Sequence, residues 1–247
     1  MKSNFKIGII GGNGQMGKAL KNFFEKRDIS VKISDINTFT SNQEVAENSD
    51  ILVIAIPSYE YESVLKEIKI NLTEDKLLMD IGSLKTREYE IMKKYHQGPI
   101  IATHSLFGPE KNFEGKDNTI IVYFEKENEK INFILNLFKK ANLKVIKISP
   151  EEHDRIMSYI HGFYYLLNIT YVSILKDEFS SIENIKFSPT SFKKYIEGLD
   201  HIFNTPSWLI EFIAYENSFI NEVKEKFINK LNSKIHVKSI KEFLGYE

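Results

Sequence analysis

A cluster of glycines after the first apolar segment constrains the fold of this chain more than any other feature. Phe5–Ile10 is predicted to be a buried strand, and Lys18–Lys26 has the apolar spacing of an amphipathic helix. The glycines between them fit the spacing G-x-G-x-x-G. In a strand–turn–helix unit this spacing permits a tight turn, a close approach of the backbone to a pyrophosphate, and close packing of helix on sheet. The helix N-terminus would attract the anion. The cofactor-binding residues predicted from this motif are Gly12, Asn13, Gly14, Gln15, Met16 and Gly17.

An acidic residue follows the second predicted strand. Val31–Ser34 ends at Asp35, which lies 18 residues after Gly17. A carboxylate at about this spacing accepts hydrogen bonds from the ribose hydroxyls of a dinucleotide, and it repels a 2′-phosphate. The pattern therefore favours NAD over NADP. The alternative is a glycine turn in an ordinary strand–helix unit, with Asp35 as a helix cap.

Bulk composition narrows the class of protein. The chain has 247 residues, no cysteine and a formal net charge of -1. The charge balance gives no indication of nucleic acid or an anionic membrane as a partner, and no apolar run is long enough to cross a bilayer. The absence of cysteine excludes disulfides, thiolate nucleophiles and cysteine-based zinc sites. We expect a cytoplasmic protein with a small-molecule substrate and no metal.

The organisation of the chain changes at Ser149-Pro150. Before this point strands alternate with helices, which predicts a doubly wound, mostly parallel α/β sheet of the Rossmann type. After it the periodicity is helical, with helices expected over about 151–177, 188–203, 206–232 and 236–243. The predicted domains are residues 1–149, which bind a dinucleotide, and 150–247, an all-α domain. Many aromatic residues in the second domain predict a homodimer formed through it.

Polar residues that follow apolar strands are the candidates for chemistry. Ligands of open parallel sheets bind beyond the carboxyl ends of the strands. His104 is the natural general base, because imidazole titrates near neutral pH. Ser83 can hydrogen-bond a substrate or orient His104, and Lys85 can supply a positive charge to a carboxylate. Pro57 and Ser58 follow another strand and join the predicted cofactor site.

A second polar group opens the helical domain. His153 lies in the sequence Glu152-His153-Asp154, and His161 lies two helical turns further on, near the same face. Both are predicted to bind substrate. We expect structural or solvated roles for His96 and His236.

Four motifs together resemble the prephenate dehydrogenase family of tyrosine biosynthesis, which includes arogenate dehydrogenases. Residues 12–17 match the family's glycine loop, and 80–85 (DIGSLK) resemble its D-x-[GA]-S-x-K segment. Residues 104–110 (HSLFGPE) resemble its H-P-M-F-G-P segment, with serine in place of proline. Residues 152–154 resemble the E-H-D opening of its helical domain.

The resemblance implies NAD-dependent oxidative decarboxylation of prephenate or arogenate. His104 would act as base toward the ring hydroxyl, Ser83 would support that hydroxyl or the nicotinamide, and Lys85 would help to hold substrate. The family also uses an arginine of the helical domain to bind a substrate carboxylate, but this chain has no arginine in the corresponding segment. Lys193, Lys194, His201 and Arg155 are the possible replacements.

Three other functions remain open on the sequence alone. A β-hydroxyacid dehydrogenase would place a catalytic lysine four residues before an asparagine, but Tyr164 holds that position before Asn168. A deazaflavin-dependent NADP reductase is opposed by Asp35. A protein that senses NAD or a metabolite without catalysis is kept open by the missing arginine.

Overall fold

The chain folds into two compact units. A computed structural model describes residues 5–111, 113–179 and 188–246. The units are Met1–His153 and Asp154–Glu247, and the division lies within a helix, just after the expected change at Ser149-Pro150. In the described residues no helix is both long and apolar enough to span a membrane.

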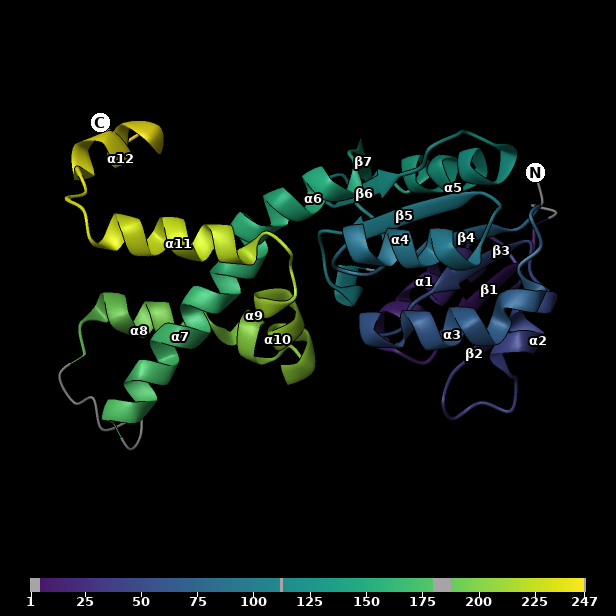
Figure 1. Cartoon of the computed structure of the whole chain (residues 1–247), viewed down its shortest axis with the longest axis horizontal. Coiled ribbons are helices and arrows are strands. Elements are labelled where there is room, and N and C mark those ends of the chain that lie inside the picture. The colour runs from purple at the N-terminus through teal and green to yellow at the C-terminus, as the bar shows by residue number, and fades with distance from the viewer. Residues whose placement is uncertain (1–4, 112, 180–187, 247) are drawn as a thin grey trace. The chain divides into compact units, whose positions relative to one another are not determined.

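The first unit is built on a seven-stranded sheet with the order β2-β1-β3-β4-β5-β6-β7 (Figure 1). All neighbouring strands run parallel except β5 and β6, which are antiparallel. The doubly wound, mostly parallel fold is therefore confirmed. The strands are β1 (Ile7–Ile10), β2 (Val31–Ser34), β3 (Ile51–Ile54), β4 (Leu77–Asp80), β5 (Ile100–Ser105), β6 (Thr119–Tyr123) and β7 (Lys144–Lys147).

Helices cover both faces of the sheet because its central strands are apolar on both sides. Along β3, Ile51 and Val53 enter one core with residues of α1 and α5, whereas Leu52 and Ile54 enter a second core with residues of α2, α3 and α4. Alternate strand residues point to opposite faces, so a continuous apolar strand needs two layers of helix. The helices are α1 (Gln15–Glu25), α2 (Asn42–Glu47), α3 (Tyr61–Ile68), α4 (Thr86–Tyr95) and α5 (Glu129–Lys140).

The second unit is helical, but its helices are shorter than expected. The expected helix over 151–177 contains a π-helical turn, Ser158–Gly162, and those over 188–203 and 206–232 are each divided in two. The second of these divisions surrounds Asn217, whose side chain donates to the Asp154 carbonyl at 2.8 Å and accepts from the Phe219 N–H at 2.9 Å. This asparagine bonds backbone groups that a continuous helix would bond internally. The observed helices are α6 (Pro150–Met157), α7 (Phe163–Glu178), α8 (Thr190–Glu197), α9 (Asp200–Phe203), α10 (Ser207–Tyr215), α11 (Ile220–Leu231) and α12 (Val237–Phe243).

Candidate active site

The glycine turn after β1 is tightly packed against the neighbouring strand β3. Gly11 has a φ of +84°, and a Cβ atom there would lie 2.4 Å from the Ala55 carbonyl oxygen. The left-handed residue of the turn is thus Gly11, one position before Gly12, the first glycine of the G-x-G-x-x-G motif and the one expected to form the tight turn. A Cβ at Gly12 would instead meet the Ile33 side chain at 2.5 Å, and one at Gly17 would lie 2.1 Å from the Gly11 carbonyl oxygen. These three glycines are required by packing.

Gly14 stands at the N-terminus of α1 and has more space. A Cβ there would approach only backbone oxygens, the nearer at 3.3 Å. Among the described residues no side chain caps this helix, and its first turn contains no acidic residue. Asn13, Gly14 and Gln15 are exposed, whereas Met16 packs partly into the core. An exposed helix N-terminus with no competing carboxylate suits a pyrophosphate.

The Asp35 carboxylate lies beside the glycine loop. One of its oxygens accepts the backbone N–H of Asn13 at 2.9 Å, and the other accepts that of Ile36 at 2.8 Å. The loop and the end of β2 are thereby held together. The chain passes from β1 outward to β2 and then back to β3 on the other side, so the strand order reverses between β1 and β3, where doubly wound folds bind their ligands.

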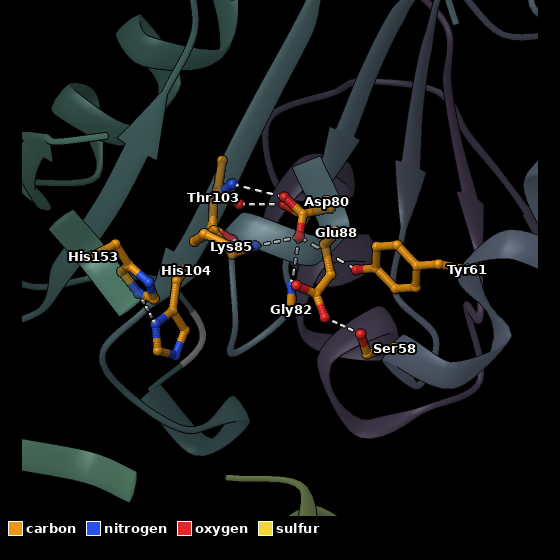
Figure 2. Close-up of polar contacts among 9 residues, drawn as sticks. All are labelled: Ser58, Tyr61, Asp80, Gly82, Lys85, Glu88, Thr103, His104 and His153. Atoms are coloured by element: carbon orange, nitrogen blue, oxygen red, sulfur yellow. Dashed lines mark hydrogen bonds and ion pairs between the residues drawn. The ribbon is translucent and has the colours of Figure 1, made fainter. Parts of the chain in front are cut away.

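Ser58 begins the short 3-10 turn Ser58–Glu60 after β3, but its side chain is directed inward. The side chain is buried, and its hydroxyl donates to the carboxylate of Glu88, which is fully buried on α4 (Figure 2). The Ser58 hydroxyl therefore has a different partner from the cofactor expected for it. Pro57, immediately before, is half-buried.

Asp80 organises the carboxyl ends of β4 and β5. It is fully buried, and its carboxylate accepts the backbone N–H of Thr103 at 2.9 Å and that of Gly82 at 3.1 Å (Figure 2). The Tyr61 hydroxyl lies 3.3 Å from the same carboxylate. Thr103 also donates its hydroxyl to the Asp80 carbonyl. These bonds fix the backbone of the residue that directly precedes His104.

The ammonium of Lys85 completes this network. It forms a buried ion pair with Asp80 and donates to the Thr103 carbonyl at 2.7 Å. The expectation that Lys85 offers its charge to a substrate carboxylate is corrected here, since only 2% of its side chain is exposed and the charge is directed to Asp80. A buried ammonium requires such a partner, because the desolvation of an isolated charge inside a protein costs several kcal/mol.

Tyr61 and Glu88 were not predicted as part of the site. Burial, followed by the charges of Asp80 and Glu88, raises the pKa of the Tyr61 hydroxyl well above its ordinary value, so the hydroxyl remains a donor. No motif indicates these two residues, and only the fold brings Tyr61 to Asp80 and Glu88 to Ser58. The sequence does indicate Asp80 as a candidate site residue, because it is a carboxylate at the end of an apolar strand.

The imidazoles of His104 and His153 lie against each other. His104 Nδ1 is 2.8 Å from His153 Nε2, and the ring centroids are 5.0 Å apart at an interplanar angle of 75° (Figure 2). Both side chains are buried, His104 at 5% exposure and His153 at 0%. His104 lies within β5, which extends to Ser105 through antiparallel pairing with β6. Ser83 is half-buried in the loop between β4 and α4.

The remaining predicted substrate-binding residues belong to the second unit. The His161 ring packs against Tyr165 at 4.9 Å between centroids, and Lys193 is exposed on α8. His201 Nδ1 donates to the Gly198 carbonyl at 2.8 Å, and Nε2 lies 3.2 Å from the Tyr164 hydroxyl. Arg155 lies 3.5 Å from Glu222.

Comparison with known proteins identifies the family. The model of the prephenate dehydrogenase nucleotide-binding domain matches residues 20–147, just over half of the chain. A Methanocaldococcus jannaschii protein named "Probable arogenate/prephenate dehydrogenase" is 32% identical over 92% of this chain and 55% of its own length. The T-protein of Enterobacter agglomerans is 25% identical over 72% of this chain and 47% of its own length. The chain thus spans about half the length of these curated relatives.

Solved structures agree on the fold. Prephenate dehydrogenase from Aquifex aeolicus, in complex with hydroxyphenyl propionate and NAD+, superposes with a TM-score of 0.75 over 93% of this chain and 89% of that one, at 20% identity. Arogenate dehydrogenase from Synechocystis gives a TM-score of 0.70 over 92% and 89%, at 14% identity. With the family model matching its sheet and helices from residue 20 through residue 147, the chain belongs to the prephenate dehydrogenase family.

Proposed function

We propose that this protein catalyses NAD-dependent oxidative decarboxylation of prephenate or arogenate, with His104 as the general base. The observation that carries the proposal is that His104 is buried beside a second imidazole, that of His153. His104 lies on β5 of the same sheet in which β1 leads into the glycine turn. Family membership supports the reaction class.

The residues around the glycine turn fit a dinucleotide. Gly14 and the open N-terminus of α1 would receive the pyrophosphate, and Asp35 would accept hydrogen bonds from the adenosine ribose. The Asp35 carboxylate would repel a 2′-phosphate, which favours NAD. When bound, NAD would accept the hydride from a substrate ring that loses its carboxylate as CO2 and becomes aromatic.

In this reaction the side chains of the protein would bind the substrate and accept one proton from it. The 4-hydroxyl of the ring must lose its proton as the carbonyl forms, and His104 would accept it at Nε2, which lies on the opposite side of the ring from His153 (Figure 2). Ser83 would hydrogen-bond the same hydroxyl. Lys193, Lys194, His201 and Arg155 are the candidates to hold a substrate carboxylate in place of the family's arginine, and His161 is a further candidate to bind substrate.

An assay with both acids tests the function. Purified protein is mixed with NAD and either prephenate or arogenate, and NADH is followed by absorbance. His104→Ala is expected to lower turnover about 100-fold or more, because a positioned base contributes about 10²–10⁴-fold, while NAD binding is retained. His236→Ala, at an exposed position, is the matched control. Turnover within a few-fold of wild type would remove His104 from the mechanism. Tight NAD binding without NADH formation would favour a sensor.

We further propose that the protein is a homodimer through its helical unit. Exposed apolar side chains recur at helical spacing along the π-helical turn and α7. They are Ile160, Tyr164, Leu167, Tyr171 and Ile174. A continuous apolar face of this kind is typical of an interface.

A further inference from the structure

His153 contacts the proposed base through a pair of ring nitrogens. His104 Nδ1 and His153 Nε2 can form a hydrogen bond only if one of them carries a hydrogen and the other a lone pair. A neutral imidazole has one nitrogen of each kind. The 2.8 Å separation is that of a hydrogen bond. The pair therefore couples the tautomer of each ring to that of its partner.

Catalysis by His104 selects one of the two arrangements. A base that accepts a proton at Nε2 must begin with that nitrogen unprotonated, so Nδ1 carries the hydrogen and donates it to His153 Nε2. When His104 becomes an imidazolium, the same hydrogen bond is strengthened, because its donor is then charged. An orienting group that fixes the tautomer of a catalytic histidine is a recurrent element of enzyme sites.

Local structure holds His153 in this position. The Ser149 hydroxyl accepts the Glu152 N–H at 3.2 Å, which starts α6, and the His153 N–H donates to the Ser149 carbonyl at 2.9 Å. His153 thus stands on the first complete turn of a capped helix, and its side chain is fully buried. Both histidines belong to the same compact unit.

We propose that His153 is a positioning residue that holds His104 in the Nδ1–H tautomer and fixes the direction of its Nε2. This role differs from the substrate-binding role expected from the sequence, and it rests on the proposed function of His104 as base.

Three substitutions of His153 distinguish a hydrogen-bonding role toward His104 from a role in packing alone. A glutamine amide reaches about as far from Cβ as Nε2, whereas an asparagine amide reaches only as far as Nδ1, and leucine has no polar atom. We expect His153→Leu and His153→Asn to lower kcat about 10-fold to 100-fold, a part of the contribution of a general base, with KM for both substrates changed less than threefold. His153→Gln is expected to recover most of the lost kcat. His236→Leu is the control.

The tautomer itself is read by ¹⁵N NMR of histidine-labelled protein, with His104→Gln used to assign the His104 signals. In the wild type we expect hydrogen on His104 Nδ1 and none on Nε2, and in His153→Leu a mixture of the two tautomers. Hydrogen on Nε2 of His104 in the wild type would overturn the proposal. This measurement needs no His153 variant, so it decides the question even if those variants do not fold.

The kinetic outcome also distinguishes this inference from the function on which it rests. Loss of turnover in His104→Ala with wild-type kcat in His153→Leu would overturn the positioning role alone. A His104→Ala variant with wild-type turnover would overturn the role of His104 and, with it, this one. A His153→Leu variant altered in KM and not in kcat would instead support direct binding of substrate and contradict the proposal.

Discussion

Replacing Lys85 with methionine tests whether the buried network at the carboxyl ends of β4 and β5 is held together by charge. Methionine retains much of the length and apolar character of the lysine side chain but removes the ammonium. The substitution leaves the Asp80 carboxylate buried without its cation, while the N–H groups of Thr103 and Gly82 still donate to it.

The size of the effect follows from these remaining donors. Removing one partner of a buried ion pair costs about 3–5 kcal/mol. Because backbone donors continue to stabilise Asp80, we expect a loss near the lower end, about 3 kcal/mol. A domain has about 5–15 kcal/mol of unfolding free energy, so the loss is a large fraction. With a urea dependence of about 2 kcal/mol per molar, the unfolding midpoint would fall by about 1.5 M.

Urea unfolding followed by far-UV circular dichroism measures this loss. Lys93→Met is the matched control, since Lys93 pairs with Glu125 at 2.9 Å but both side chains are about half exposed, at 43% and 53%. Exposed pairs contribute about 0.2–1 kcal/mol. A Lys85→Met protein within about 1 kcal/mol of wild type, no worse than the control, would refute the reasoning.

Four further results are expected. Gly11→Ala forces a left-handed residue against the Ala55 carbonyl and should destabilise the protein by about 1–3 kcal/mol in the same urea assay; an unchanged midpoint would contradict the turn geometry. Asp35→Asn removes the charge that opposes a 2′-phosphate, so the kcat/KM ratio for NADP over NAD should rise about tenfold, and a constant ratio would remove Asp35 from cofactor selection. Burial lowers the pKa of His96 below its ordinary value, so the unfolded chain takes up the proton first and stability should be lost as pH falls below about 6.5; His96→Gln, which can still donate to the Lys76 carbonyl, should show a shallower loss between about pH 7 and 5. Light scattering at micromolar protein should give twice the chain mass of 28.8 kDa, and a monomer would exclude the proposed dimer.

Most of the first unit could be predicted because its signals are local. The central strands β1 and β3 lie in short apolar runs bounded by polar, glycine or proline residues, and the motif glycines have a fixed spacing in the sequence. The helices of the second unit were predicted as elements, but their interruptions were not. The division around Asn217 depends on a hydrogen bond to the carbonyl of Asp154, 63 residues earlier, which no local pattern encodes.

The candidate site shows the same limit at the level of single side chains. Lys85 and Ser58 were recognised as polar residues at strand ends, but the direction of each side chain depends on a partner from another element, Asp80 for one and Glu88 for the other. A charge or hydroxyl near a sheet edge can face either solvent or protein, and the sequence around it is compatible with both.

The amino-acid sequence by itself determined the alternation of strands and helices in the first unit, the helical character of the second, the glycine turn and the place of His104 at the end of an apolar strand, since these follow from periodicity and from backbone sterics over a few neighbours. It did not predict the short helix α2. Only the tertiary structure decided that Asp80 binds Lys85 and that His153 lies against His104. The His104–His153 contact joins residues 49 positions apart, and the Asp80–Lys85 ion pair closes the loop between β4 and α4. Both form because buried polar groups must find partners among the side chains that the packed elements bring within hydrogen-bond distance.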